Sequence, residues 1–87
     1  MKMRVEYVKR RPNQLEEGVL YICKECEVAF HLCPCGCGEE VVTPLGNEGW
    51  QLMEHEDGTI SLYPSIGNFS FKCQSHYFII QNEVAFV

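Results

Sequence analysis

Hydrophobic and polar residues alternate along much of the chain, in short runs. The first run, Met3–Lys9, alternates apolar residues with charged ones, which is the period of a half-buried β-strand. Gly18–Cys23 and Cys26–Cys33 follow as two more strand-like runs, with a turn at Lys24 and Glu25 between them. No long window repeats apolar residues at helical spacing, so the pattern predicts β-structure.

The second half of the chain continues in the same way. Asp57 and Gly58 predict a tight hairpin between two runs, and Pro64–Asn68 is expected to be a loop because proline, glycine and asparagine punctuate it. Phe69–Cys73 could also be extended. The remaining strand-like runs are Val41–Thr43, Trp50–Glu54, Ile60–Tyr63, Tyr77–Gln81 and Val84–Val87. We therefore expect an all-β fold, a small antiparallel sheet or sandwich of about seven short strands, forming a single zinc-binding domain over residues 1–87.

The cysteine content is high for a chain of this length, with six cysteines in 87 residues. A chain of this size buries only about 60% of its unfolded surface, and small domains usually add disulfides, a metal or a partner. Met1–Glu6 is charged and no apolar run follows it, so we expect no signal peptide. No segment has the length of a membrane span. We expect a cytoplasmic protein, in which cysteines are more often metal ligands than disulfides.

The net charge of −5 reflects seven Lys and Arg against twelve Asp and Glu. Nucleic-acid-binding proteins normally show a basic patch. The one basic cluster, Lys9–Arg11, is interpreted as a solvated loop. We therefore expect neither a nucleic acid nor a membrane as a partner.

One stretch, His31–Gly38, places a histidine and three cysteines at alternate positions, namely His31, Cys33, Cys35 and Cys37. Alternate side chains of an extended segment point to the same face. Gly36 and Gly38 allow the backbone to bend so that neighbouring sulfurs can reach one ion. Ligands of this kind suit tetrahedral Zn²⁺, and Cys73 is the natural distal ligand.

Spacing alone offers more ligands than one zinc ion needs. Cys23 and Cys26 have the familiar Cys-x-x-Cys chelating spacing and would rank first by that criterion, the alternative being two small apolar residues of a hairpin. His31 and His76 each lie within three residues of a candidate ligand, so each can be a ligand or a catalytic group. These four residues therefore remain alternative ligands.

Ser65 is the candidate nucleophile. It stands between Pro64 and Ile66–Gly67 on the expected loop, where a hydroxyl can be presented to solvent. The alternative for Ser65, and for Ser75, is an ordinary turn serine that hydrogen-bonds the local backbone. His55 stands between two glutamates and is interpreted as a surface residue.

The same residues carry a resemblance to a known family, over most of the chain from Leu15 to Val87. The matching segments are Leu15–Tyr21, His31–Gly38, Val41–Leu45, Trp50, Ile60–Asn68, Cys73 and Ser75–Ile79. Over them the chain resembles a family of small, cysteine-rich, predicted metal-binding domains of unknown function. Bacterial operons encode that family beside ubiquitin-like proteins and E1-like and E2-like enzymes. Cys23 and Cys26 depart from its pattern.

The resemblance implies a metal site assembled from Cys33, Cys35, Cys37 and Cys73, with the histidines as possible further members. It also implies partners, namely the ubiquitin-like protein and the E1-like or E2-like enzymes. A conjugation system needs an enzyme that trims the precursor or removes conjugates, and the family is a candidate for that peptidase work. Cys23 and Cys26 would then lie outside the family's metal site, and would form a second site, a redox pair or neither.

Two mechanisms fit a peptidase. In the serine version Ser65 is the nucleophile, His76 or His31 takes its proton, and zinc holds the loops together. In the metal version zinc keeps an open position and activates a water molecule. We favour the serine version because three or four thiolates make zinc a poorer Lewis acid. The acidic residues that could orient the histidine are Glu39, Glu40 and Asp57.

Two further hypotheses belong to other classes. The first is a non-catalytic, zinc-stabilised module that binds the ubiquitin-like or E2-like protein. The second is a redox or metal-trafficking protein that uses Cys23 and Cys26, for which Lys24 alone gives little reason for a lowered thiol pKa.

Overall fold

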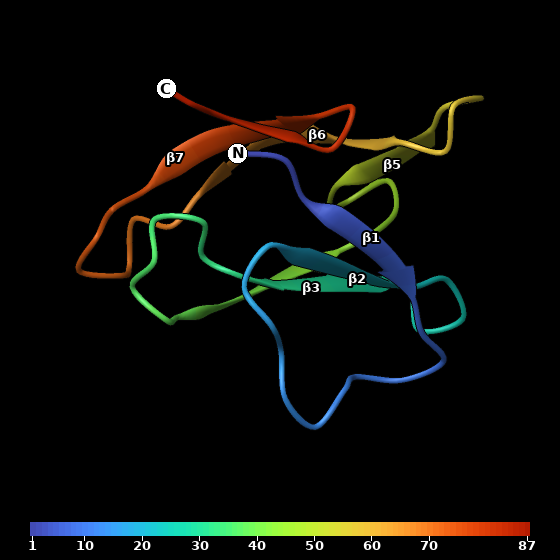
Figure 1. Ribbon diagram of the computed structural model, residues 1–87, viewed down its shortest axis with the longest axis horizontal. Helices are drawn as coiled ribbons and strands as arrows, with labels where there is room; N and C mark the ends of the chain where they lie inside the picture. Colours follow the sequence, from blue (N-terminus) through green and yellow to red (C-terminus); the bar gives the residue numbers. More distant parts are fainter.

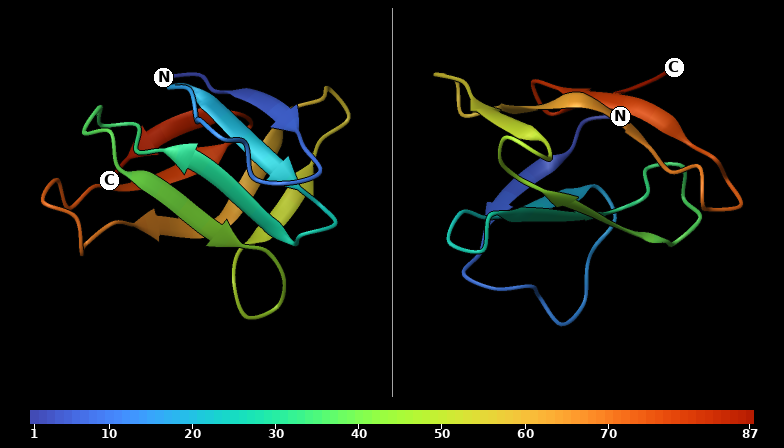
Figure 2. Two further views of the ribbon diagram at one scale, coloured as in Figure 1. Left: turned by 90° about the horizontal axis from the view of Figure 1, so that it is seen from below. Right: turned by 180° about the vertical axis from the view of Figure 1, so that it is seen from behind.

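The computed structural model describes residues 1–87, which form eight strands and no helix. The strands are β1 (Arg4–Tyr7), β2 (Val19–Cys23), β3 (Val28–Leu32), β4 (Glu40–Pro44), β5 (Gln51–Glu54), β6 (Ile60–Gly67), β7 (His76–Ile80) and β8 (Glu83–Phe86). They form two four-stranded sheets, in the orders β1-β2-β3-β4 and β5-β6-β7-β8, which lie as two layers (Figures 1 and 2). The expected all-β sandwich is confirmed, with eight strands instead of about seven. No helix that could span a membrane is found.

Chain neighbours are antiparallel within each sheet, with one exception. β1 pairs in parallel with β2, from Arg4 opposite Val19 to Tyr7 opposite Ile22. A parallel pair needs a connection that crosses from one end of the sheet to the other. Residues 8–18 make that connection without regular secondary structure, as the long blue loop below the first sheet in Figure 1.

The inner faces of the two sheets share one core. Leu20 and Ile22 of the first sheet are completely buried, as are Leu62 and Ile79 of the second. Strand residues alternate between faces, so the residues between these core positions point away from the partner sheet. Burying one face of each sheet holds the two layers together.

The outer face of the first sheet has a second apolar cluster. Val19, Tyr21 and Phe30 point to this face and are buried beneath the connection of residues 8–18, which contributes Leu15. β2 and β3 are therefore covered on both sides by the chain itself, while Val42 of β4 stays exposed on the outer face.

Strand β6 differs most from the sequence expectation. Pro64–Asn68 was expected to be a loop, but the strand continues to Gly67. Its pairing with β7 shifts register between Leu62 and Ile66. Proline has no N–H to donate to a ladder, and a bulge is one of the positions in a sheet where it is tolerated. The extended strand brings Ser65 beside β7.

Phe69–Cys73 also differs, because it is not extended. The segment makes two turns, in which the Phe71 N–H donates to the Asn68 carbonyl at 3.0 Å and the Gln74 N–H donates to the Phe71 carbonyl at 3.1 Å. The predicted hairpin at Asp57 and Gly58 is confirmed, since β5 and β6 pair in antiparallel fashion around it.

Candidate active site and cysteine cluster

Ser65 and His76 meet on the outer face of the second sheet. Ile66 and Tyr77 are buried partners in the ladder and point inward, so the preceding residue of each strand points outward. The Oγ atom of Ser65 lies 2.7 Å from Nε2 of His76, and both side chains are half-exposed. A hydroxyl at this distance from an imidazole nitrogen can pass its proton to that nitrogen.

Two aromatic rings flank His76. The ring centroid of Phe69 lies 5.5 Å from that of His76 in an edge arrangement, and the Phe78 centroid lies 6.5 Å away in a stacked one. Gly67, the ladder partner of His76, has no side chain, and a methyl group there would collide with the Phe69 ring. Glycine at position 67 therefore allows Phe69 to lie beside the imidazole.

The side chain of Trp50 holds the backbone of Ser65 through a hydrogen bond. Nε1–H of Trp50 donates to the Ser65 carbonyl at 3.3 Å. No acidic side chain hydrogen-bonds to His76. Of the three candidate orienting residues, Glu40 pairs with Arg11 and Asp57 accepts from Thr59. The third, Glu39, has no side-chain hydrogen bond to a histidine. The arrangement is a Ser–His dyad.

His31 belongs to β3 of the first sheet and points into the core between the two sheets. Ser65 lies on the outer face of the second sheet, so the two residues are on opposite sides of that sheet. His31 is completely buried, and its Nε2 atom lies 2.6 Å from the hydroxyl of Tyr77, which points into the core. Burial lowers the pKa of His31 to about 4, so the imidazole is neutral near pH 7. Of the two histidines named by sequence, His76 is therefore the one within reach of Ser65. The Nδ1 atom of His31 is buried without a hydrogen-bond partner.

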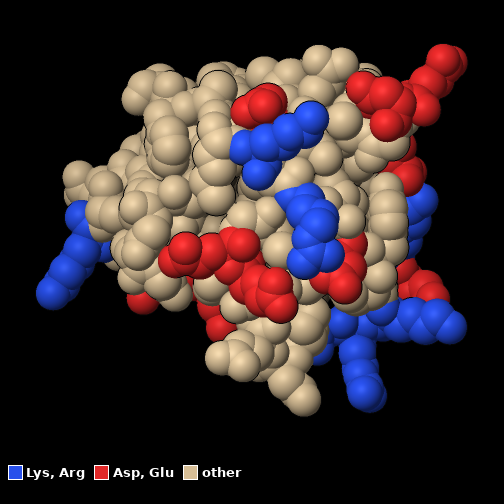
Figure 3. Space-filling model, viewed as in Figure 1, with Lys and Arg blue, Asp and Glu red and all other residues tan.

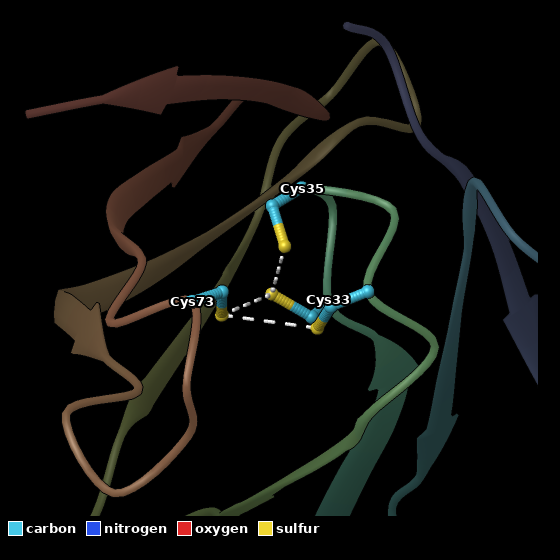
Figure 4. A group of neighbouring side chains, drawn as sticks. Cys33, Cys35 and Cys73 are labelled. Carbon is cyan, nitrogen blue, oxygen red and sulfur yellow. Dashed lines mark hydrogen bonds between the residues drawn. The ribbon is translucent and has the colours of Figure 1, made fainter.

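The four predicted cysteine ligands come together. Their sulfur atoms all lie within 4.8 Å of one another. Figure 4 shows Cys33, Cys35 and Cys73 turned toward each other, with Sγ of Cys33 lying 3.4 Å from Cys35 and 3.8 Å from Cys73. Cys37 lies 3.8 Å from Cys73. Three ligands thus come from the turn after β3 and the fourth from the β6–β7 loop.

The sulfur set fits a tetrahedral metal ion. Four sulfurs at about 2.3 Å from one Zn²⁺ stand roughly 3.8 Å apart. The Cys33–Cys73 and Cys37–Cys73 sulfur separations are both 3.8 Å. A set of four thiolates leaves no open coordination position, which is typical of a structural site. The residues present can therefore hold a metal ion that cross-links the two loops.

Two polar side chains donate to these sulfurs. The Ser75 hydroxyl donates to Sγ of Cys73 at 3.2 Å, and Nδ2 of Asn68 donates to Sγ of Cys33 at 3.6 Å. The Ser75 hydrogen bond lowers the pKa of Cys73, whereas burial raises the pKa of Cys33. Hydrogen bonds to metal-bound sulfur stabilise the thiolate and hold its orientation.

Cys23 and Cys26 take no part in this cluster. They form a disulfide across the β2–β3 turn, with Cys23 buried and Cys26 exposed. This differs from the expectation of reduced thiols, and it removes both residues as ligands of the four-cysteine site. The tight turn that Cys-x-x-Cys spacing predicts is present, and the two sulfurs bond to each other.

Sequence reasoning missed the neighbours of the site. It did not identify Phe69, Phe78 or Trp50 as partners of the Ser–His pair, nor Asn68 as a donor to sulfur. The alternation His76-Tyr77-Phe78 could have placed His76 and Phe78 on one face. The contacts of Phe69 and Asn68 depend on the β6–β7 loop, and that of Trp50 depends on how the segment before β5 lies against β6; the sequence pattern offered no signal for either.

Comparison with known proteins identifies one family. A family model described as bacterial ubiquitination-like system serine protease (BubE) matches residues 7–87. No curated protein and no solved structure matches the chain.

Proposed function

The chain belongs to this family of bacterial ubiquitination-like system serine proteases, and we propose that it is a serine peptidase with Ser65 as nucleophile and His76 as general base. The observation that carries the proposal is the 2.7 Å contact between Ser65 Oγ and His76 Nε2 on an accessible face of the second sheet. The family description supports the reaction class. The two residues supply the nucleophile and the base that the class requires.

In the first step Ser65 attacks the carbonyl carbon of the scissile peptide bond. Its proton passes to Nε2 of His76, and the carbonyl oxygen takes up negative charge in a tetrahedral intermediate. The intermediate collapses when the C–N bond breaks and His76 returns the proton to the leaving amine. An acyl ester on Ser65 remains.

Water completes the cycle. His76 takes a proton from the attacking water, the ester C–O bond breaks, and the proton returns to Ser65 while the carboxyl product leaves. Without a carboxylate partner, the ring of His76 is held by Phe69 and Phe78, the two aromatic residues that contact it. Trp50 holds the backbone at Ser65.

The proposed cofactor is one structural Zn²⁺ held by Cys33, Cys35, Cys37 and Cys73. When bound, the ion supplies a cross-link between the turn after β3 and the β6–β7 loop. That loop joins the strand of Ser65 to the strand of His76, so the cross-link supports the geometry of the dyad while taking no part in bond cleavage. Its binding energy contributes to folding.

The proposed substrate is the precursor or a conjugate of the ubiquitin-like protein of the same system. The proposed partners are that protein and the associated E1-like and E2-like enzymes, in the cytoplasm. Trimming a precursor tail and releasing a conjugate both require attack on a carbonyl carbon at the end of the ubiquitin-like domain. One Ser–His dyad can serve both reactions.

The test combines cleavage with chemical labelling. The purified protein is incubated with the precursor from its own system, and products are read by intact mass while metal content is measured on the same sample. A fluorophosphonate probe should label Ser65, as mapped by peptide mass spectrometry, and should not label the buried Ser61. Cleavage at one defined bond, with one zinc per chain, is the expected result.

An intact precursor and an unlabelled Ser65 in zinc-loaded protein would overturn the proposal. Tight binding of the ubiquitin-like or E2-like protein in that sample would instead support a non-catalytic binding module. Cleavage that persists in Ser65→Ala at an unchanged rate would reject the serine mechanism.

A further inference from the structure

The outer face of the second sheet carries large apolar side chains that the chain leaves exposed. Met53, Tyr63 and Ile80 point to this face and are 48%, 38% and 39% exposed. Phe69, which lies over Gly67 at the end of the same face, is 62% exposed. An antiparallel sheet normally alternates apolar residues inside with polar residues outside, so this surface departs from the rule.

Charge is also scarce here. Between Ile60 and Gln81 the chain has a single Lys, Arg, Asp or Glu residue, Lys72, and it lies in the β6–β7 loop. In Figure 3 most charged side chains lie over the first sheet and near the right edge, and an adjoining red and blue patch lies at the top centre. The upper left part, over β7, is free of charged side chains. The surface around Ser65 and His76 is therefore apolar and uncharged, and the charge of Glu83, the ladder partner of Ile80, lies at the far end of the face.

The first sheet also has an apolar outer face, and there a segment of the same chain covers it. There Leu15 and the connection of residues 8–18 bury Val19, Tyr21 and Phe30. On the second sheet only Ser61, at the far end, is covered, by His55 and the turn at Gln81. The exposed apolar face of the second sheet is continuous with the Ser–His dyad. The polypeptide that the dyad would cleave is therefore the expected binding partner of this face.

The apolar residues form a track along the strands. Phe69 and Gly67 mark one end, Ser65 and His76 come next, Tyr63 and Phe78 follow, and Met53 and Ile80 mark the far end, level with Ser61. The six residue-to-residue steps of strand from Ser61 to Gly67 span about 20 Å at roughly 3.3 Å per step. The dyad lies near one end, so most of the track extends to one side of it.

We propose that this track is a substrate subsite that binds an extended, uncharged polypeptide segment with apolar side chains, on one side of the scissile bond. The inference rests on the proposed peptidase function and names what its substrate must look like. A segment of about four or five residues would cover the distance from Ser65 to the level of Met53 and Ile80, about 13 Å.

The type of contact follows from the topology. β6 and β7 are paired on both sides within the sheet, so a substrate cannot add to them as a further strand. It lies across the face and is recognised by its side chains. A charged substrate residue would lose its hydration on this surface without gaining a partner, which is costly. The track therefore selects apolar segments and rejects charged ones.

The experiment places a charge at the far end of the track, away from the dyad. Ile80→Glu and Met53→Glu are compared with Val42→Glu, a matched control, because Val42 is 51% exposed on β4 of the other sheet. With the precursor as substrate, we expect both track variants to raise KM at least tenfold with kcat within threefold of the unmodified protein. The control should change neither constant. Zinc content and thermal midpoint establish that each variant is folded.

A second measurement needs no protein variant. Precursors with a single Glu placed at successive positions on either side of the scissile bond are cleaved by the unmodified protein. We expect kcat/KM to fall at consecutive positions on one side only. If the unmodified protein cleaves but neither the Glu variants nor the Glu-bearing precursors change KM, the subsite is overturned while the peptidase stands. If nothing is cleaved, the proposed function fails, and the subsite fails with it.

Discussion

Strand β6 carries two serines that each contact a histidine, one at each end of the strand. Ser61 Oγ lies 2.8 Å from Nε2 of His55, and Ser65 Oγ lies 2.7 Å from Nε2 of His76. Ser61 is completely buried and also accepts the backbone N–H of Gln81 at 2.9 Å. Ser65 is half-exposed and has no such donor.

The difference separates a structural serine from a candidate nucleophile. At the first pair the hydroxyl satisfies a buried N–H and is closed to a substrate, so its role is to hold the β7–β8 turn against β6. At the second pair the oxygen lone pairs face a surface that a polypeptide can reach. A Ser–His distance is therefore insufficient evidence of catalysis, since burial and the other partners of the oxygen decide the role.

Removing the proposed metal cross-link should have the largest effect on this comparison. We expect Cys73→Ser to reduce zinc content and to lower the free energy of unfolding by about 5 kcal/mol or more, because metal-binding energy is folding energy. Under mild conditions hydrogen exchange should rise in residues 68–76, beside His76, before it rises in residues 55–61. The control is Cys26→Ser, which should keep one zinc per chain. Equal zinc content in the two variants would show that Cys73 is not a ligand.

Replacing each of the two histidines separately by glutamine tests the dyad directly. We expect His76→Gln to lower kcat about 10³-fold, equivalent to about 4 kcal/mol, because the general base is lost. His55→Gln should keep kcat within about threefold. Rates are measured on the precursor by intact mass, with the thermal midpoint as the test of folding. Similar losses in both variants would remove the functional distinction between the two pairs.

The buried serine should matter for stability and not for cleavage. In Ser61→Ala the Gln81 N–H loses its acceptor, and an unpaired buried donor costs about 1–3 kcal/mol. Urea unfolding should report this loss, while the kcat/KM of the remaining folded protein stays within about twofold. A large fall in kcat/KM with unchanged stability would mean that Ser61 contributes to the reaction.

The smallest effect concerns the hairpin that positions His55. Hydrogen bonds from the Thr59 hydroxyl and N–H lower the pKa of Asp57 below its usual range. The folded state therefore favours the carboxylate, and this contribution is present above the ordinary pKa and is lost as the pH falls through the folded value. We expect Asp57→Asn to lower the thermal midpoint slightly at neutral pH.

The same variant should match the unmodified protein in acid below the folded-state pKa of Asp57. Comparing the two proteins at each pH cancels losses that they share, such as loss of zinc. A difference that stays constant across the pH range would exclude the charge of Asp57 as its cause.

Local pattern was sufficient for much of the fold. Alternation located the strand regions, and Asp57-Gly58 located a hairpin, because side-chain period and turn conformation depend on neighbours in sequence. The same pattern was insufficient at Pro64–Asn68, where turn-forming residues lie within a strand. Pairing with β7 and a register shift accommodate the proline there. The parallel pairing of β1 with β2 also has no local signal.

The candidate site divides in the same way. Cys33, Cys35 and Cys37 lie within one turn, so spacing alone predicted their convergence, and Cys73 was added from the resemblance and as the natural distal cysteine. The disulfide of Cys23 and Cys26 shows the limit of spacing, because the same short turn suits a metal or an S–S bond.

By itself the sequence determined the all-β class and the convergence of Cys33, Cys35 and Cys37, since these follow from residue type and short spacing. It also named Ser65, His76 and His31 as candidates, while the resemblance completed the cysteine set with Cys73. Only the tertiary structure decided which histidine meets Ser65. The register of β6 on β7 sets this, because a one-residue change moves every side chain of a strand to the other face. That register places Tyr77 in the core, where its hydroxyl meets His31 of β3, and places His76 beside Ser65 on the open face.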